Sequence, residues 1–210
     1  MKPKDIISVQ SLFLQDIDYK NEITFPFSAA IHPWHSTKFD SKEICKMLDE
    51  LSSQKNLIAI GETGLDKACT ADYEIQKKVF DMHVDFARSY NKPLIIHLVK
   101  SWNELIPRLK QAKVPCVLHG YSEGVVLTRQ LIDLGCYFSI GKSILNPSRR
   151  LLEAIKMIPL TLLFLETDEA IMPIQEIYHQ MSKILDLPMD LLKIQIYNNF
   201  ASLFSSPSEI

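Results

Sequence analysis

Seven short, nearly unbroken apolar runs alternate with amphipathic stretches along this chain, and this alternation constrains the fold more than any other feature. Runs such as LIAIGE (57–62) and PLIIHL (93–98) are rich in branched residues, which is typical of parallel strands covered on both faces. The other five runs occupy 6–12, 27–32, 115–119, 136–141 and 160–168. Strands and helices that alternate in this way predict an α/β fold with a parallel sheet.

The stretches between the runs have helical spacing. A first helix is expected over 41–53, with Ser41 as its cap, and a second over 72–90. The apolar stripe of the second helix is expected to be Ile75, Val79, Met82 and Phe86. Further helices are expected over 102–112, 148–158, 174–186 and 189–204. Two architectures fit this order, an open doubly wound sheet and a TIM-type (β/α)8 barrel with its first strand missing or incomplete.

Composition narrows the class of protein. The 210 residues suit one domain spanning 1–210, and the net charge of -2 gives no global basic field that would attract nucleic acid. The four cysteines form no CxxC pair, so we interpret them as reduced thiols of a cytoplasmic protein. No apolar run reaches the roughly 20 residues of a membrane span, and the N-terminus does not resemble a secretory signal. We expect a monomer or weak oligomer without a membrane partner, and a frayed tail at 205–210.

Polar residues that can bind metal recur where the predicted strands end. They are His32, Glu62 with Asp66 beyond it, His97, His119, and Glu166 with Asp168. In a parallel barrel these ends lie on one face, so their side chains converge. Imidazoles and carboxylates without a thiolate suit Zn, Mn or Mg.

Each of these residues also has a simpler interpretation. A histidine at a strand end is often a satisfied polar group, and an acid there often caps the next helix. Asp168 is the residue to which the capping alternative applies most directly. His83 and His179 fall within helical patterns, and we interpret both as surface or helix-face residues. Five coincidences at the same end of successive strands favour a shared site, and the sequence contains no GxSxG or GxxxxGK[ST] motif.

Six segments together resemble the TatD family of metal-dependent hydrolases. They are AAIHPWH (29–35), AIGETGLD (59–66), PLIIH (93–97), VLHGYSE (117–123), YFSIGKS (137–143) and LLFLETDEA (162–170). The resemblance runs in order from about Phe27 to Phe204. It implies a TIM-type barrel with two divalent cations and hydrolysis of phosphodiester bonds, often as a DNase with 3'–5' exonuclease activity, so that nucleic acid is the expected substrate.

The resemblance also implies roles for individual residues. Glu62 would bridge both ions, His97 and His119 would bind one of them, and Asp168 would bind the other. Glu62 and Asp168 are the expected catalytic residues. His32, Asp66 and Lys100 are the expected substrate-binding residues.

One departure from the family pattern bears on the chemistry. The family opens with a strand ending in His-x-His, which supplies two ligands to one ion, whereas no histidine precedes His32 here. We therefore expect one occupied ion site instead of two, and reduced turnover. Two other functions stay open: an amidohydrolase or lactonase acting on a small molecule, and a degenerate barrel that binds metal without turnover.

Overall fold

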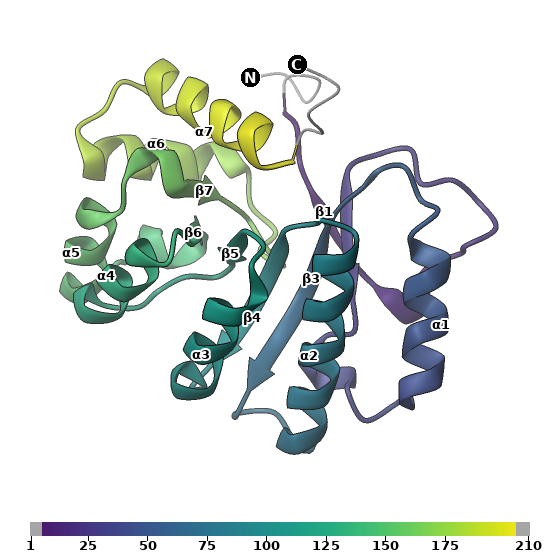
Figure 1. Cartoon of the computed structure of the whole chain (residues 1–210). Coiled ribbons are helices and arrows are strands. Elements are labelled where there is room, and N and C mark those ends of the chain that lie inside the picture. Colours follow the sequence, from purple (N-terminus) through teal and green to yellow (C-terminus); the bar gives the residue numbers. More distant parts are fainter. Residues whose placement is uncertain (1–5, 205–210) are drawn as a thin grey trace. The chain divides into compact units, whose positions relative to one another are not determined.

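The computed structural model describes residues 6–204, and the expected tail at 205–210 lies outside them. Contacts divide the chain into two compact units, Met1–Cys116 and Val117–Ile210. The elements from β1 to α3 belong to the first unit and those from α4 to α7 to the second (Figure 1). Both units consist of parallel strands joined through helices, which confirms the predicted α/β class.

The first unit contains four strands that pair in chain order. They are β1 (Gln10–Phe13), β2 (Phe27–Ala30), β3 (Leu57–Asp66) and β4 (Leu94–Val99). Helices α1 (Ser41–Leu51), α2 (Tyr73–Ser89) and α3 (Trp102–Ala112) follow β2, β3 and β4, close to the predicted bounds. The segment between β1 and β2 contains no α-helix and forms only a short 3-10 helix, Leu14–Asp16.

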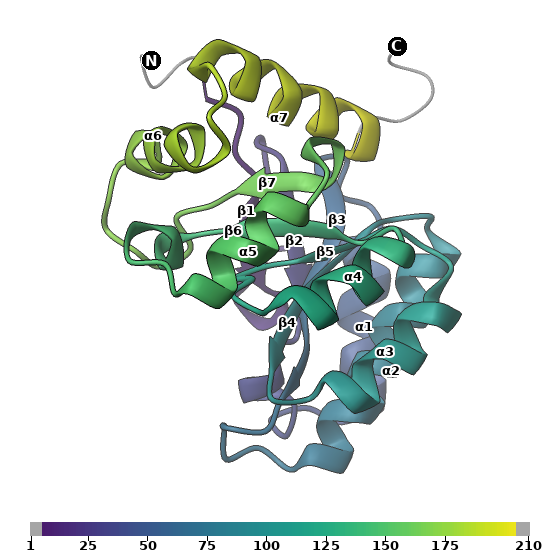
Figure 2. The ribbon, with the colours of Figure 1, turned by 90° about the vertical axis from the view of Figure 1, so that its left-hand side faces the viewer.

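The second unit repeats this pattern with shorter strands. β5 (Cys116–Leu118) leads into it, and β6 (Tyr137–Ile140) pairs with β5 and with β7 (Leu163–Leu165). Its helices are α4 (Val125–Asp133), α5 (Arg149–Met157), α6 (Ile174–Leu185) and α7 (Met189–Phe204), and Figure 2 shows α4 and α5 side by side. The sequence did not predict α4. Its N-cap, Gly124, offers no side-chain cap, and its apolar residues do not all lie on the buried face, since Val126 is 77% exposed.

Two details of the predicted helices were wrong. The N-cap of α1 is Asp40 and not Ser41: its carboxylate accepts hydrogen bonds from two backbone amides, and Glu43 bonds back to the Asp40 amide. On α2, Ile75 is exposed, whereas Gln76 and His83 are buried. His83 is therefore a helix-face residue but not a surface residue. His179 on α6 is exposed, as expected.

β3 is longer than predicted and carries a bulge. Ile60 pairs with Leu94 and Thr63 with Ile96, so β3 contains one more residue than β4 over the same interval. The extra residue falls at Gly61–Glu62, and a bulge of this kind re-aims a side chain. Glu62 consequently lies inside β3 and not at its end.

Glycines allow β3 and β4 to approach each other closely. A Cβ on Gly61 would overlap atoms of Ile95, and one on Gly64 would overlap the carbonyl oxygen of His97. Both positions need hydrogen in place of a side chain.

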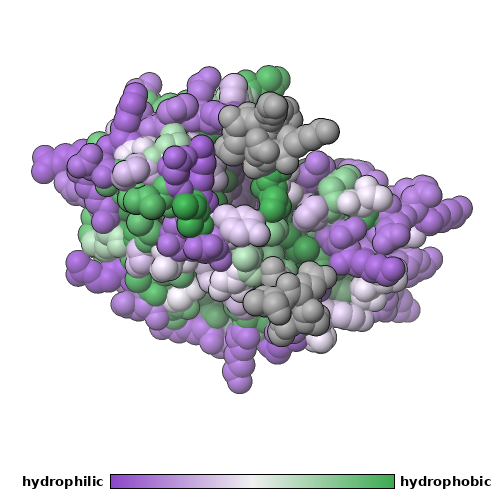
Figure 3. Space-filling view, turned by 90° about the horizontal axis from the view of Figure 1, so that it is seen from above, coloured by the Kyte–Doolittle hydropathy of each residue, from purple (hydrophilic) through white to green (hydrophobic). Residues whose placement is uncertain are grey.

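The surface in Figure 3 is mostly hydrophilic, with hydrophobic residues scattered among the polar ones. Large apolar side chains with more than half of their area exposed include Leu191, Ile194 and Tyr197, all on α7. Among residues 6–204, none of the helices has the length and apolarity needed to cross a bilayer.

Candidate metal centre

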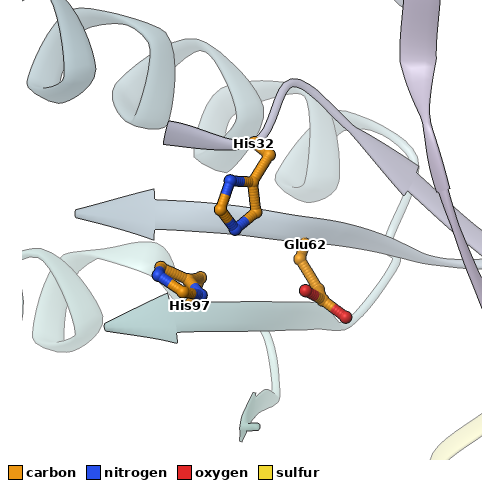
Figure 4. Close-up of side chains that lie close together, drawn as sticks. All are labelled: His32, Glu62 and His97. Carbon is orange, nitrogen blue, oxygen red and sulfur yellow. The ribbon is translucent and has the colours of Figure 1, made fainter. Parts of the chain in front are cut away.

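Three side chains from successive strands of the first unit lie close together. They are His32, just after β2, Glu62 at the bulge in β3, and His97 in β4 (Figure 4). One potential ligand atom of each lies within 4.8 Å of the other two. An imidazole and a carboxylate at this spacing suit Zn²⁺ or a similar divalent cation, because such ions bind nitrogen and oxygen ligands that converge.

A buried carboxylate orients His97. The Nε2 atom of His97 lies 3.4 Å from Oδ2 of Asp66, which is only 4% exposed. When Nε2–H donates to this carboxylate, the ring's lone pair is on Nδ1. A carboxylate that holds a histidine in one tautomer is the usual support of a metal ligand.

Asp66 is itself held in place by hydrogen bonds. Its carboxylate accepts from the indole N–H of Trp34 at 2.7 Å and from the amide of Ala68 at 2.7 Å. Burial disfavours its charged form, but the hydrogen bonds from Trp34, Ala68 and His97 outweigh burial and lower the pKa of Asp66. Asp66 therefore stays a carboxylate at neutral pH, and its oxygens contact Trp34, Ala68 and His97.

Gln76 on α2 fixes the backbone around Asp66. Its Oε1 accepts the Asp66 amide at 2.8 Å, while its Nε2 donates to the Asp66 carbonyl at 3.1 Å. Nε2 also lies 3.0 Å from the carbonyl oxygen of Ala71 and 3.2 Å from the sulfur of Cys69. One buried amide thus positions the whole turn that follows β3.

The backbone on both sides of His32 is fixed. The amide of Ile31 donates to Nε2 of His83 at 3.0 Å, while Nδ1 of His83 donates to the Val79 carbonyl. Burial lowers the pKa of His83 to about 4, so this histidine is neutral and accepts the Ile31 proton. Beyond His32, the Trp34 amide donates to its Nδ1 at 3.3 Å. An Nδ1 that accepts leaves the proton of a neutral ring on Nε2, which makes His32 a hydrogen-bond donor.

The second unit brings a different set of predicted residues together. His119 directly follows β5, and its Nδ1 lies 3.9 Å from Oε1 of Glu166, which directly follows β7. The same oxygen accepts the amide of Gly120 at 2.6 Å. Burial lowers the pKa of His119, against the opposing effect of the Asp168 charge, so the imidazole stays neutral and able to bind a metal.

Asp168 does not cap a helix. The helix that follows it, α6, begins at Ile174 with Pro173 as its N-cap, so the simpler interpretation of this acid is excluded. Asp168 is exposed and has a positive φ of 51°, a left-handed conformation that aspartate tolerates better than most residues do.

Lys100, the remaining predicted residue, is exposed, as are two other lysines that follow strand ends. Lys100 follows β4 with a φ of 53°, and Lys142 begins the 3-10 helix after β6. Lys67 forms an ion pair of 2.7 Å with Glu104.

Sequence reasoning missed the contribution of Trp34 to this centre. Trp34 lies two residues after His32 in AAIHPWH, and that closeness was the available signal.

Comparisons with known proteins identify the family of this chain. The family model described as "TatD related DNase" matches residues 9–205. An uncharacterized metal-dependent hydrolase of Buchnera aphidicola is 30% identical over 86% of this chain and 74% of its own length. The uncharacterized metal-dependent hydrolase YcfH of Escherichia coli is 32% identical, over 68% of this chain and 54% of its own, so the match spans about half of that relative.

Solved structures give the same result. The structure of YjjV, a TatD homolog from Escherichia coli, is 25% identical with a TM-score of 0.75, over 87% of this chain and 78% of its own. A TatD family hydrolase from Entamoeba histolytica has a TM-score of 0.73 at 20% identity, over 89% and 77% of the two chains. The likeness confirms the predicted TIM-barrel-like fold class. The chain belongs to the TatD-related DNase family.

Proposed function

We propose that this chain is a metal-dependent hydrolase that cleaves phosphodiester bonds, with nucleic acid as its substrate and the cytoplasm as its location. The observation that carries the proposal is the cluster of His32, Glu62 and His97, with a buried carboxylate behind His97. The donor set fits a divalent cation such as Zn, Mg or Mn, because His97 has its lone pair on Nδ1 and Glu62 supplies an anionic oxygen.

In this proposal Glu62 and His97 hold the cation. The resemblance to the family adds His119 and Asp168 to the ligand set. A bound divalent cation supplies a water of lowered pKa and a charge that offsets the phosphate oxygens. Asp168 accepts the proton of the attacking water. His32 donates from Nε2 to a phosphate oxygen, and Lys100 offsets part of the phosphate charge. We keep the prediction that Asp66 lies beside the substrate. Its contacts with Trp34, Ala68 and His97 favour a role in positioning His97.

We further propose one tightly bound ion per chain, held by Glu62 and His97 of the first unit. Calorimetric titration of metal-free protein with Zn²⁺ and with Mn²⁺ tests this number. One tight site is expected in the unmodified protein and none in Glu62→Gln or His97→Ala. His179→Ala, at an exposed position of α6, is the matched control and should bind as the unmodified protein does. Two tight ions would contradict the one-ion proposal.

Activity is tested by loading the protein with metal and supplying single-stranded DNA beside a panel of small esters, lactones and amides. Release of mononucleotides that disappears in His97→Ala and Glu62→Gln supports the phosphodiesterase. Turnover of only the small substrates would replace it with the amidohydrolase alternative. Tight metal binding without turnover of any substrate would indicate the degenerate barrel.

A further inference from the structure

Two exposed aromatic side chains border the candidate metal centre, and the proposed chemistry uses neither. Trp34 is 49% exposed and Phe13 is 38% exposed. Their ring centroids lie 4.6 Å and 6.0 Å from the ring centroid of His32. The centroid of Trp34 also lies 6.0 Å from that of His97. Rings that are open to solvent therefore lie directly against the side chains of the centre.

The Trp34 ring is held in a defined orientation. Its indole N–H donates to Oδ2 of Asp66 at 2.7 Å, and its backbone amide donates to His32. Pro33, which precedes it, begins the 3-10 helix Pro33–His35 and restricts the backbone. A ring that is already ordered loses little conformational entropy when a ligand packs on it.

The Phe13 ring is supported on a different side chain. Its centroid lies 4.9 Å from that of His35, in an edge-to-face arrangement, and Nδ1 of His35 is 2.9 Å from Nε2 of Gln15. Phe13 ends β1 and Trp34 lies beyond the end of β2, two strands that pair directly. The two rings are thus held by different partners, and each lies beside the ring of His32.

Exposed, ordered aromatic faces next to a hydrolytic centre select for planar partners. Stacking on an indole or phenyl face stabilises a bound flat ring. It depends little on which heteroaromatic ring is bound. We propose that Trp34 and Phe13 form a specificity subsite, which takes a planar heteroaromatic ring such as a nucleobase beside the bond that is hydrolysed. This inference rests on the proposed function, since it names the group that must flank the scissile phosphate.

Fluorescence tests the subsite without any turnover. The chain has two tryptophans, so Trp102→Phe leaves Trp34 as the sole reporter. In the presence of Zn²⁺, dAMP should quench this tryptophan and bind roughly 5- to 150-fold more tightly than 2-deoxyribose 5-phosphate, which carries the same phosphate without a base.

Two substitutions separate stacking from the hydrogen bond to Asp66. Trp34→Phe and Trp34→Leu both lose the indole N–H, but only the first keeps an aromatic face. Calorimetry should show that Trp34→Phe retains most of the preference for dAMP and that Trp34→Leu loses it, with Phe13→Leu intermediate. Tyr90→Leu, at a 43% exposed aromatic after α2, should keep the full preference. Thermal melting confirms that each variant is folded.

The outcomes distinguish this inference from the proposed function. Equal affinity of the unmodified protein for dAMP and deoxyribose phosphate, or binding of neither, overturns the subsite. Equal hydrolysis of a normal and an abasic oligonucleotide also overturns the subsite while keeping the phosphodiesterase. A clear preference for dAMP in a protein that hydrolyses no phosphodiester supports the subsite and removes the proposed function.

Discussion

The two units of this protein support a histidine in two different ways. In the first, the carboxylate beside His97 is buried and, besides its contact with His97, accepts hydrogen bonds from Trp34 and Ala68. In the second, the side chain of Glu166 is 18% exposed, lies 3.9 Å from His119 and accepts one backbone amide. The difference teaches that a histidine can be supported by a buried carboxylate that protein donors hold in place, as at His97, or by a partly exposed carboxylate at a longer distance, as at His119.

Replacing a glycine in each unit should give the largest difference in unfolding free energy between the two units. Gly64→Ala puts a methyl group onto the carbonyl of His97, so β3 and β4 must separate and we expect a loss of about 4 kcal/mol or more in unfolding free energy. Gly135→Ala in the second unit meets no atom within 4 Å and has only its φ of 71° to strain, at about 1 kcal/mol. Urea denaturation measures both. Equal losses would contradict the contrast in packing.

Acid should destabilise the first unit by protonating His83. Its pKa of about 4 in the folded protein lies below the roughly 6.5 of an unfolded chain. Neutral His83 therefore contributes stability above pH 6.5 that is lost as pH falls toward 4, about 3 kcal/mol in all. Urea denaturation at several pH values should show a shallower pH dependence in His83→Gln over this window. His179→Gln, at the exposed histidine of α6, should leave the dependence unchanged.

Isosteric changes in the two carboxylates should separate their roles in metal binding. Asp66→Asn should weaken Zn²⁺ or Mn²⁺ binding by about 10- to 100-fold, because the support of a metal ligand is lost. Glu166→Gln should have the smaller effect, about 10-fold or less on the same scale, since Glu166 holds its histidine at a longer distance. A larger effect of Glu166→Gln would reverse the comparison of the units.

Removing a helix cap in each unit should give the smallest difference in stability between the two units. The Asp40 cap of α1 accepts two backbone amides in a reciprocal capping box, whereas Ser148 of α5 accepts one at 3.2 Å. Alanine at either position should cost about 0.5–2 kcal/mol, with Asp40→Ala toward the upper end. Thermal melting of the two variants, compared with the unmodified protein, measures the difference. A greater loss in Ser148→Ala would contradict it.

The sequence predicted the elements better than the faces they bury. Apolar runs located all seven strands, because parallel strands are apolar on both sides. On α2 the stripe through Ile75 was wrong, because Gln76 and His83 are polar but buried, and no hydropathy pattern shows that backbone groups satisfy them.

The candidate site was predictable only in part. His32, Glu62 and His97 could be identified as a set, since each falls in or near the end of an apolar run. The bulge that re-aims Glu62 could not be predicted, because it depends on the register of β3 against β4. The role of Asp66 behind His97 depends on contacts between residues 31 positions apart in the chain, which spacing alone does not reveal.

Gln76 has a consequence for how the protein responds to its solvent. The backbone of Asp66 is held by an uncharged amide, whereas the next residue, Lys67, is held by an ion pair with Glu104. Dissolved salt screens interactions between charges over about 10 Å at 0.1 M, but it has little effect on a buried hydrogen bond between neutral groups. Rising ionic strength should therefore loosen the Lys67–Glu104 pair long before it disturbs the hydrogen bonds between Gln76 and Asp66.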